Sequence, residues 1–312
     1  MTTPARPHTG RLAVASGALA ACIVGGSVPV TGMLAGYPVL SGQAVRYAIG
    51  AVALYGWLRY LGRRLPRPGW RDVLGLAGMV AFGMLGFNAA LLAAQRYAEP
   101  GFVAAMLGGT PLFLAIVVPA LRGRRPALLA LVGAVIVVSG VLVLSGGGSW
   151  HGPGLLLSVL VLLGEVMFTV SGVGVTRRLG VVEASTWASA AAAVIGAGIS
   201  SVVSGSAAWP MPSGRQWVAL AVLGVLVTAV AFVGWYSAVV ALGADRAGVL
   251  IGLMPVAGLV TSVLLGAQLL SFTGVGGALL VGLGCVVGLR RRVSGRRGPS
   301  GARPARSPAV PG

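Results

Sequence analysis

The chain has 312 residues, of which 56% are hydrophobic and only 9% are charged. Soluble domains carry about 25% charged residues, so this composition, with a mean hydropathy of +0.93, excludes a soluble globular protein. In a soluble protein the formal net charge of +18 would suggest a nucleic-acid partner. Here the arginines share no face with stacking aromatic residues, and we predict no nucleic-acid partner.

Ten apolar stretches follow one another along the chain. A helix needs about 20 apolar residues to cross a hydrocarbon core about 30 Å thick. On that rule the sequence predicts ten transmembrane helices, at residues 12–32, 39–59, 73–94, 102–121, 127–144, 154–175, 184–204, 217–239, 247–265 and 271–289. The predicted fold class is an all-α integral membrane protein.

The arginines lie mostly in the gaps between these stretches and predict a topology. If the amino terminus is cytoplasmic, nearly all the basic residues face the cytoplasm, whereas Arg96 and Arg215 face out and Arg46 lies in the membrane. This bias selects an even number of spans with both termini inside. A cleaved signal peptide is the alternative for the first span, but its apolar run is too long for that and further spans follow.

The two ends of the chain differ from its interior. Residues 1–11 are expected to form a cytoplasmic tail, and the arginine-rich residues 290–312 a disordered basic tail that is either solvated or attracted to anionic lipid headgroups. The use of arginine in place of lysine, with no organelle-targeting segment, favours a bacterial plasma membrane. Cys22 and Cys285 fall inside predicted spans without metal-ligand partners nearby, so no metal or cofactor is predicted.

The sequence contains an internal repeat. A shift of 144 residues aligns residues 101–144 with 245–288. The matches include residues that mark backbone geometry, namely Gly108 with Gly252, Pro111 with Pro255, Gly133 with Gly277 and Gly140 with Gly284. Because each unit holds five spans, the second unit must enter the membrane from the opposite side. The sequence therefore predicts two inverted five-helix repeats, at residues 12–144 and 154–289.

Two prolines occupy matching places in these repeats. Pro111 and Pro255 lie inside the fourth and ninth spans, each after a glycine-containing stretch. Proline removes a helix hydrogen bond and crowds the preceding turn, so both positions are expected to break a helix. Paired breaks of this kind point to a substrate site near the midplane of a secondary transporter.

The ordered set of Arg46, the two prolines and the glycines of the fifth and tenth spans resembles the drug/metabolite transporter (DMT) superfamily. Within it, the pattern is similar to the ten-helix EamA-like transporters with two EamA repeats, over residues 12–289. The resemblance implies a secondary transporter, more commonly an exporter. The family usually has a glutamate just after the fourth and ninth spans, where this chain has Arg124 and Gln268.

Glu165 is the one acidic residue in the middle of a predicted span. An ionised carboxylate there costs about 2.5 to 3.5 kcal/mol, so it usually faces a cavity, finds a partner or stays protonated. At 1.5 Å per residue, Arg46 lies about 12 Å and Glu165 about 16 Å from the outer surface. We hypothesise that both line a central cavity, where Glu165 binds a substrate amine or coupling proton and Arg46 an anionic group. The alternatives are a neutral Glu165 that locks two helices together and an Arg46 that snorkels or caps a carbonyl.

Four further residues are weaker candidates for the same site. Asn88 and Thr110 could line the cavity or hold helices together. Trp187 and Trp235 could gate it, although an aromatic belt at the membrane interface also explains them. Tyr47 adjoins Arg46 and is expected on a different helix face.

The leading prediction is an ATP-independent transporter that moves small metabolites, amino acids or drugs by alternating access, with protons as a possible coupling ion. No Walker motif is present. One alternative is an intramembrane enzyme acting on a lipid-linked substrate, but the chain has no HExxH or GxSxG motif and no second carboxylate near Glu165. Another is a non-transporting scaffold. The sequence is compatible with a monomer or a homodimer, in which the fifth and tenth spans are peripheral or dimer-forming.

Overall fold

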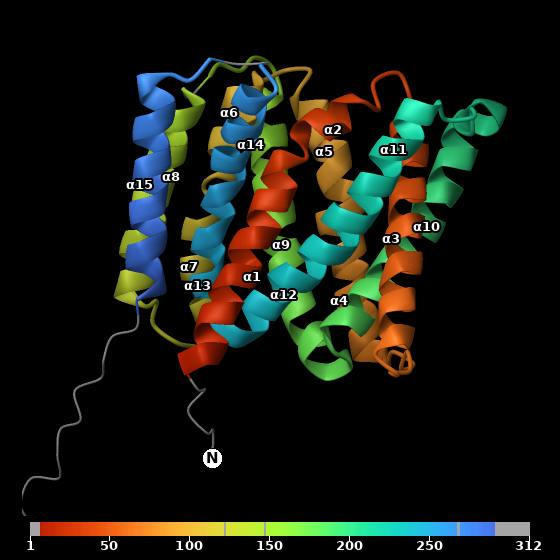
Figure 1. The fold of residues 1–312 in the computed structure, drawn as a ribbon, viewed down its shortest axis with the longest axis horizontal. Helices are drawn as coiled ribbons and strands as arrows, with labels where there is room; N and C mark the ends of the chain where they lie inside the picture. The colour runs from red at the N-terminus through yellow and green to blue at the C-terminus, as the bar shows by residue number, and fades with distance from the viewer. Residues whose placement is uncertain (1–6, 122, 147, 267–268, 291–312) are drawn as a thin grey trace, which may run out of the picture.

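The protein is a bundle of helices that stand side by side, joined by short loops (Figure 1). A computed structural model describes residues 7–121, 123–146, 148–266 and 269–290. The first half contains α1 (Pro7–Gly26), α2 (Val28–Gly32), α3 (Val39–Tyr60), α4 (Trp70–Gly78), η1 (Met79–Leu85), α5 (Gly86–Ala94), α6 (Pro100–Leu107), α7 (Thr110–Leu121) and α8 (Leu128–Ser145). The second half contains α9 (Gly154–Leu179), α10 (Val181–Ser204), η2 (Gly205–Ala208), α11 (Gly214–Val222), η3 (Leu223–Val230), α12 (Ala231–Leu242), α13 (Ala244–Ala247), η4 (Gly248–Gly252), α14 (Leu253–Leu264) and α15 (Phe272–Leu289).

The helices are long and apolar enough for a membrane protein. Among the described residues, 9 helical segments meet the length and hydropathy expected of a membrane span. The remaining expected span corresponds to α3, which has 22 residues but carries polar side chains that include Gln43 and Arg46. The all-α membrane fold is confirmed, and the count of ten spans stays a prediction.

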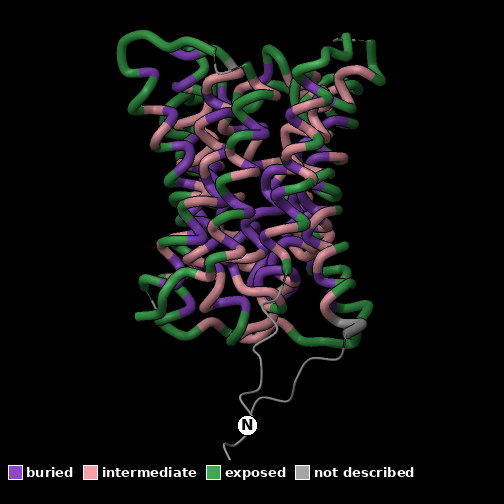
Figure 2. The backbone as a smooth tube through the Cα atoms, turned by 90° about the vertical axis from the view of Figure 1, so that its left-hand side faces the viewer, coloured by how far each residue is buried: buried purple, intermediate pink, exposed green. Residues whose placement is uncertain are grey.

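Large apolar side chains cover the outside of the bundle. Val52 and Val194 are each 74% exposed, and Leu279 is 70% exposed. Buried residues gather along the middle of the bundle, as Figure 2 shows. An apolar exterior around a closely packed interior is the arrangement that a lipid environment favours.

The 144-residue repeat is visible in helices beyond the two aligned spans. Shifting α8 by 144 positions gives the bounds of α15, and the same shift of α4 gives those of α11. Two π-helical segments, η1 and η3, both begin at equivalent positions, Met79 and Leu223. The duplication is therefore visible in helix irregularities as well as in helix lengths.

Helices α8 and α15 pack closely at one edge of the bundle (Figure 1). A Cβ atom at Gly133 would lie 2.7 Å from the carbonyl oxygen of Gly284, and one at Gly140 would lie 2.8 Å from that of Gly277. These contacts advance along α8 as they retreat along α15, so the two helices are antiparallel. Since α8 and α15 are counterparts in the two halves, this is the packing that an inverted repeat predicts.

The arginines gather at one end of the bundle. Helix α1 begins and α15 ends there, as Figure 1 shows at its lower side. The described arginines in the helix ends and loops of this arginine-rich end are Arg11, Arg59, Arg63, Arg64, Arg67, Arg71, Arg124, Arg125, Arg177, Arg178, Arg246 and Arg290. The opposite end carries Arg96 and Arg215.

Candidate functional site

A cavity of about 560 Å³ lies between the two halves. Its walls come from α1, α2, α3, η1, α5 and α6 of the first half and from α9, η3, α12, η4 and α14 of the second. The polar and ionisable lining residues, apart from tryptophan, are Ser27, Thr31, Gln43, Arg46, Tyr47, Asn88, Gln95 and Glu165. Most of this set comes from the first half, and Glu165 belongs to the second.

The cavity opens at the end opposite the arginine-rich end. Its lining residues Thr31 and Gln95 lie at that end and are exposed. On the other side the floor consists of Phe168, Phe232 and Trp235, all of which are buried. Among the described residues, the exposed part of the lining is therefore at one end of the cavity and the packed aromatic part at the other.

Arg46 and Glu165 both line this cavity, from α3 and α9. The Arg46 guanidinium donates from Nε to Thr228 Oγ1 at 3.1 Å and from Nη1 to Gln43 Oε1 at 3.2 Å. It also lies over the Tyr47 ring, 5.2 Å from the ring centroid. Within the described part of the chain, Arg46 and Glu165 form no ion pair with each other. Both ionisable side chains therefore line the cavity without direct contact between them.

Asn88 connects two walls of the cavity. Its Nδ2 donates to the hydroxyl oxygen of Tyr47 at 3.3 Å and to the carbonyl oxygen of Met84 at 2.5 Å. Tyr47 is 1% exposed and lines the same cavity as Arg46. Tyr47 was expected on a different helix face from Arg46, yet both residues line the cavity, because a cavity this wide is lined by neighbouring faces of one helix.

The other predicted residues are distributed more widely. Trp235 and Pro255 line the cavity, whereas Thr110, Pro111 and Trp187 are outside its lining. Thr110 is fully buried at the start of α7, after the helix interruption that separates α6 from α7. Trp187 lies toward the arginine-rich end, where its indole Nε1 donates to the carbonyl oxygen of Pro66 at 2.9 Å.

The floor of the cavity is a packed aromatic cluster. The Phe168 ring centroid lies 5.2 Å from that of Phe232 and 5.3 Å from that of Tyr236. The Tyr236 hydroxyl donates to the carbonyl oxygen of Phe168 at 2.9 Å, which ties α12 to α9. Gly83 lets η1 approach this cluster, since a Cβ there would lie 2.2 Å from Phe168. Aromatic side chains of the second half, packed against η1 of the first half, thus close the path toward the arginine-rich end.

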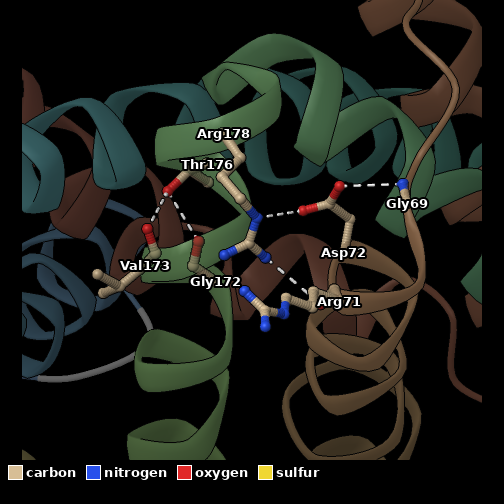
Figure 3. Close-up of polar contacts among 7 residues, drawn as sticks. All are labelled: Gly69, Arg71, Asp72, Gly172, Val173, Thr176 and Arg178. Carbon is tan, nitrogen blue, oxygen red and sulfur yellow. Dashed lines mark hydrogen bonds and ion pairs between the residues drawn. The ribbon is translucent and has the colours of Figure 1, made fainter.

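Two ion pairs join the halves beyond this floor. Arg178 on α9 pairs with Asp72 on α4 at 2.5 Å, and Figure 3 shows Asp72 also accepting from the Gly69 backbone. Arg63 pairs with Glu183 on α10 at 2.6 Å. Each pair connects a residue of the first half to one of the second, at the closed end of the bundle.

Sequence reasoning missed several residues of the site. Gln43 precedes Arg46 by three positions and Tyr47 by four on α3, which places it on an adjoining helix face, and it could have been recognised. Thr228 carried no such signal, because its role depends on the π-helical segment that contains it. The aromatic floor residues were equally hidden among many apolar residues.

Comparison with known proteins agrees with this architecture. The family model described as "EamA-like transporter family" matches residues 11–146 and 152–290. A Bacillus subtilis (strain 168) protein described as "Uncharacterized transporter YetK" is 25% identical over 279 residues, covering 87% of this chain and 83% of its own. One crystal structure aligns with 88% of this chain and 95% of its own, at 20% identity and a TM-score of 0.73, which shows a shared fold.

The fold and the cavity define a helical membrane protein of the transporter class. The chain belongs to the EamA-like transporter family, with one match to the family in each half. This assignment is consistent with the DMT superfamily and supports a role in membrane transport.

Proposed function

We propose that the protein is a secondary transporter that exports small metabolites, amino acids or drugs by alternating access. The observation that carries this proposal is the cavity between the halves, which is open at one end, closed at the other and lined by Arg46 and Glu165. A cavity at the interface of duplicated halves is where secondary transporters bind solute and coupling ion. Rocking one half against the other would expose the same residues to the opposite side.

The chemistry of the lining favours a solute with an anionic group. A guanidinium presents several N–H groups in a fixed plane that suits a carboxylate or phosphate. We propose that Arg46 binds this group and that Glu165 binds a substrate amine or a coupling proton. The apolar body of the solute would pack against Phe168, Phe232 and Trp235.

The arginine distribution supports an orientation. Cytoplasmic loops of membrane proteins carry the excess of arginine and lysine. We therefore propose that the arginine-rich end faces the cytoplasm, with both termini inside, in a bacterial plasma membrane. The conformation described above then faces outward.

A flux comparison tests the function. Metabolite profiles of medium from cells with and without the protein would identify an exported compound, whose flux is then measured in sealed vesicles. Glu165→Gln is expected to abolish the transport or its pH dependence, and Arg46→Gln to raise the KM for an anionic solute at least tenfold. Glu99→Gln is the matched control, because Glu99 is a carboxylate outside the cavity. Normal transport by Glu165→Gln would remove Glu165 from the site, and a solute that emerges covalently changed would indicate an enzyme.

A further inference from the structure

Thr228 is held in an unusual way within η3. In the α-helices, the hydroxyl groups of Thr176, Thr186 and Thr261 each donate to the carbonyl oxygen four residues earlier. The Thr228 hydroxyl instead donates to Leu223, five residues earlier, at 3.2 Å. This longer reach follows from the wider π-helical turn, a feature often found at functional sites.

The hydrogen bond that the Thr228 hydroxyl donates leaves its oxygen only as an acceptor. A hydroxyl has one proton and two acceptor positions. Since the proton is directed to Leu223, the Thr228 oxygen can only accept, and it accepts from Arg46 Nε at 3.1 Å. Thr228 is fully buried, so water does not compete for this contact.

Two glycines bring η3 close enough to α3 for this contact. A Cβ at Gly50 would lie 2.5 Å from Thr228 Cγ2, and one at Gly224 would lie 2.9 Å from the carbonyl oxygen of Arg46. Neither residue could carry a side chain without moving the helices apart. The crossing of α3 and η3 thus places a second-half hydroxyl on a first-half arginine.

In the first half, a residue just beyond the π-helical segment η1 bonds the next residue of α3. Asn88, just after η1, donates to Met84 and to the hydroxyl of Tyr47. Met84 and Thr228 are equivalent positions in the repeat. Thr228 of η3 therefore holds Arg46, and Asn88 of α5, bonded to the Met84 carbonyl of η1, holds Tyr47, over whose ring the guanidinium lies.

The bonded guanidinium retains free donors. Arginine has five N–H groups, and Thr228 and Gln43 occupy one each. Among the described residues no acceptor takes the other three. An arginine whose plane is fixed on one side and whose remaining donors belong to a cavity wall is prepared for a planar anion.

We propose that Thr228 is a positioning residue for the anion site: its hydroxyl fixes the plane of Arg46 so that the remaining N–H groups receive the anionic group of the solute. This inference rests on the proposed function, because it takes Arg46 as the anion-binding residue. It adds that affinity depends on a hydroxyl in the opposite half. Thr228 itself need not touch the solute.

Binding of radiolabelled benzoate to the purified full-length protein tests this role. Benzoate joins a carboxylate to a ring that fits the aromatic lining, and benzamide is its uncharged counterpart. We expect the wild type to bind benzoate at least tenfold more tightly than benzamide, and Arg46→Gln to remove that difference. Thr228→Val, which keeps the shape and removes the hydroxyl, should weaken benzoate binding about five- to tenfold without changing benzamide binding.

Two matched variants separate positioning from packing. Thr228→Ser restores the hydroxyl and should bind benzoate within about twofold of the wild type. Thr186→Val removes a buried hydroxyl from α10 that contacts only its own helix, and should leave binding unchanged. An effect of Thr228→Val that Thr228→Ser does not reverse, or that Thr186→Val reproduces, would overturn the inference.

The remaining outcomes distinguish this inference from the proposed function. If benzoate binding depends on Arg46 but not on Thr228, the positioning role is overturned and the anion site stands. If benzoate and benzamide bind the wild type alike, the anion site is overturned and the positioning role falls with it.

Discussion

The ion pairs at the arginine-rich end are expected to hold this end of the transporter closed. Arg63 and Arg178 each connect one half to a carboxylate on the other. The carboxylates are nearly buried, with side-chain exposures of 3% for Glu183 and 11% for Asp72, whereas the arginines are about half exposed. Replacing both arginines with glutamine leaves two shielded carboxylates without their partners whenever this end is closed.

The size of the effect follows from this geometry. Leaving a buried charged group without its partner costs about 1 to 3 kcal/mol or more. Because the arginines are half exposed, we take the cost of losing each ion pair as about 1 kcal/mol. Together the two losses amount to about 2 kcal/mol, or roughly a 30-fold shift toward the state open at this end. Opening of the arginine-rich end separates the halves and so breaks both ion pairs. Loss of the pairs therefore destabilises only the closed state and shifts the equilibrium toward the open one.

A buried cysteine can report this shift. Thr169 is fully buried on α9, one turn from Glu165 toward the arginine-rich end. In a background with Cys22→Ser and Cys285→Ala, we expect Thr169→Cys to react slowly with a maleimide added at this end. The Arg63→Gln and Arg178→Gln double variant should raise that rate about tenfold or more.

The control is a change of arginine at the opposite end. Arg96→Gln and Arg215→Gln remove the same charges without touching either ion pair and should leave the rate unchanged. Equal rates in the wild type and the Arg63/Arg178 variant, both correctly folded, would refute the idea that these pairs keep the end closed.

Two further predictions concern packing and an outer loop. Gly140→Val would place atoms within 3 Å of the Gly277 carbonyl oxygen and should destabilise the protein by about 1 to 3 kcal/mol. Gly282 has open space around its Cα, so Gly282→Val should not destabilise the protein. Midpoints of thermal unfolding would show the difference. Hydrogen bonds from Ser149 hold the pKa of the Glu99 carboxyl below its ordinary value of 4.5. Their stabilisation should therefore be complete above pH 4.5 and be lost as the pH falls through the lower folded pKa. Ser149→Ala should reduce the change of the thermal unfolding midpoint between pH 5 and pH 3. The same pH dependence in the variant and the wild type would contradict the stabilising role of these hydrogen bonds.

The positions of the helices could be predicted from the sequence because a membrane span must be apolar over a set length. Every described helix overlaps one of the ten predicted spans, apart from the short η2 segment, since apolar length alone determines where a chain can cross. The repeat was recognised in its last two spans, and the bounds of α4 and α11 and the starts of η1 and η3 follow the same shift. These earlier segments have diverged in residues, so a count of identities could not detect them.

The site was predicted only in part, for a physical reason. Arg46, Glu165 and Asn88 were recognisable because a polar side chain in a membrane span needs an explanation of its own. Thr228 was not, because a hydroxyl can satisfy itself on its own helix. Its importance depends on which residue the neighbouring helix brings within 3.1 Å. The ion pairs were hidden similarly, since Asp72 and Arg178 lie 106 positions apart.

Equivalent positions of the two halves carry different side chains in the cavity. The position equivalent to Glu165 is Ala21, and the one equivalent to Asn88 is Phe232; all four residues line the cavity. The duplicated backbone repeats similar helices in the two halves. The side chains make the two halves chemically unequal.

The bonds that join the halves also differ between the two ends of the bundle. The arginine-rich end is held by ion pairs, whereas at the opposite end α3 and its preceding loop meet the second half through neutral bonds, from Tyr37 to Pro210 and from Ser41 to Ala208. At the position equivalent to Asp72, α11 has Gln216, which carries no charge. Because charge-assisted bonds are about twice as strong as neutral ones, the halves are joined more strongly at the arginine-rich end than at the opposite end. A resting state closed at the arginine-rich end is what this asymmetry of charge predicts, and it is the state in which the cavity is open to the opposite side.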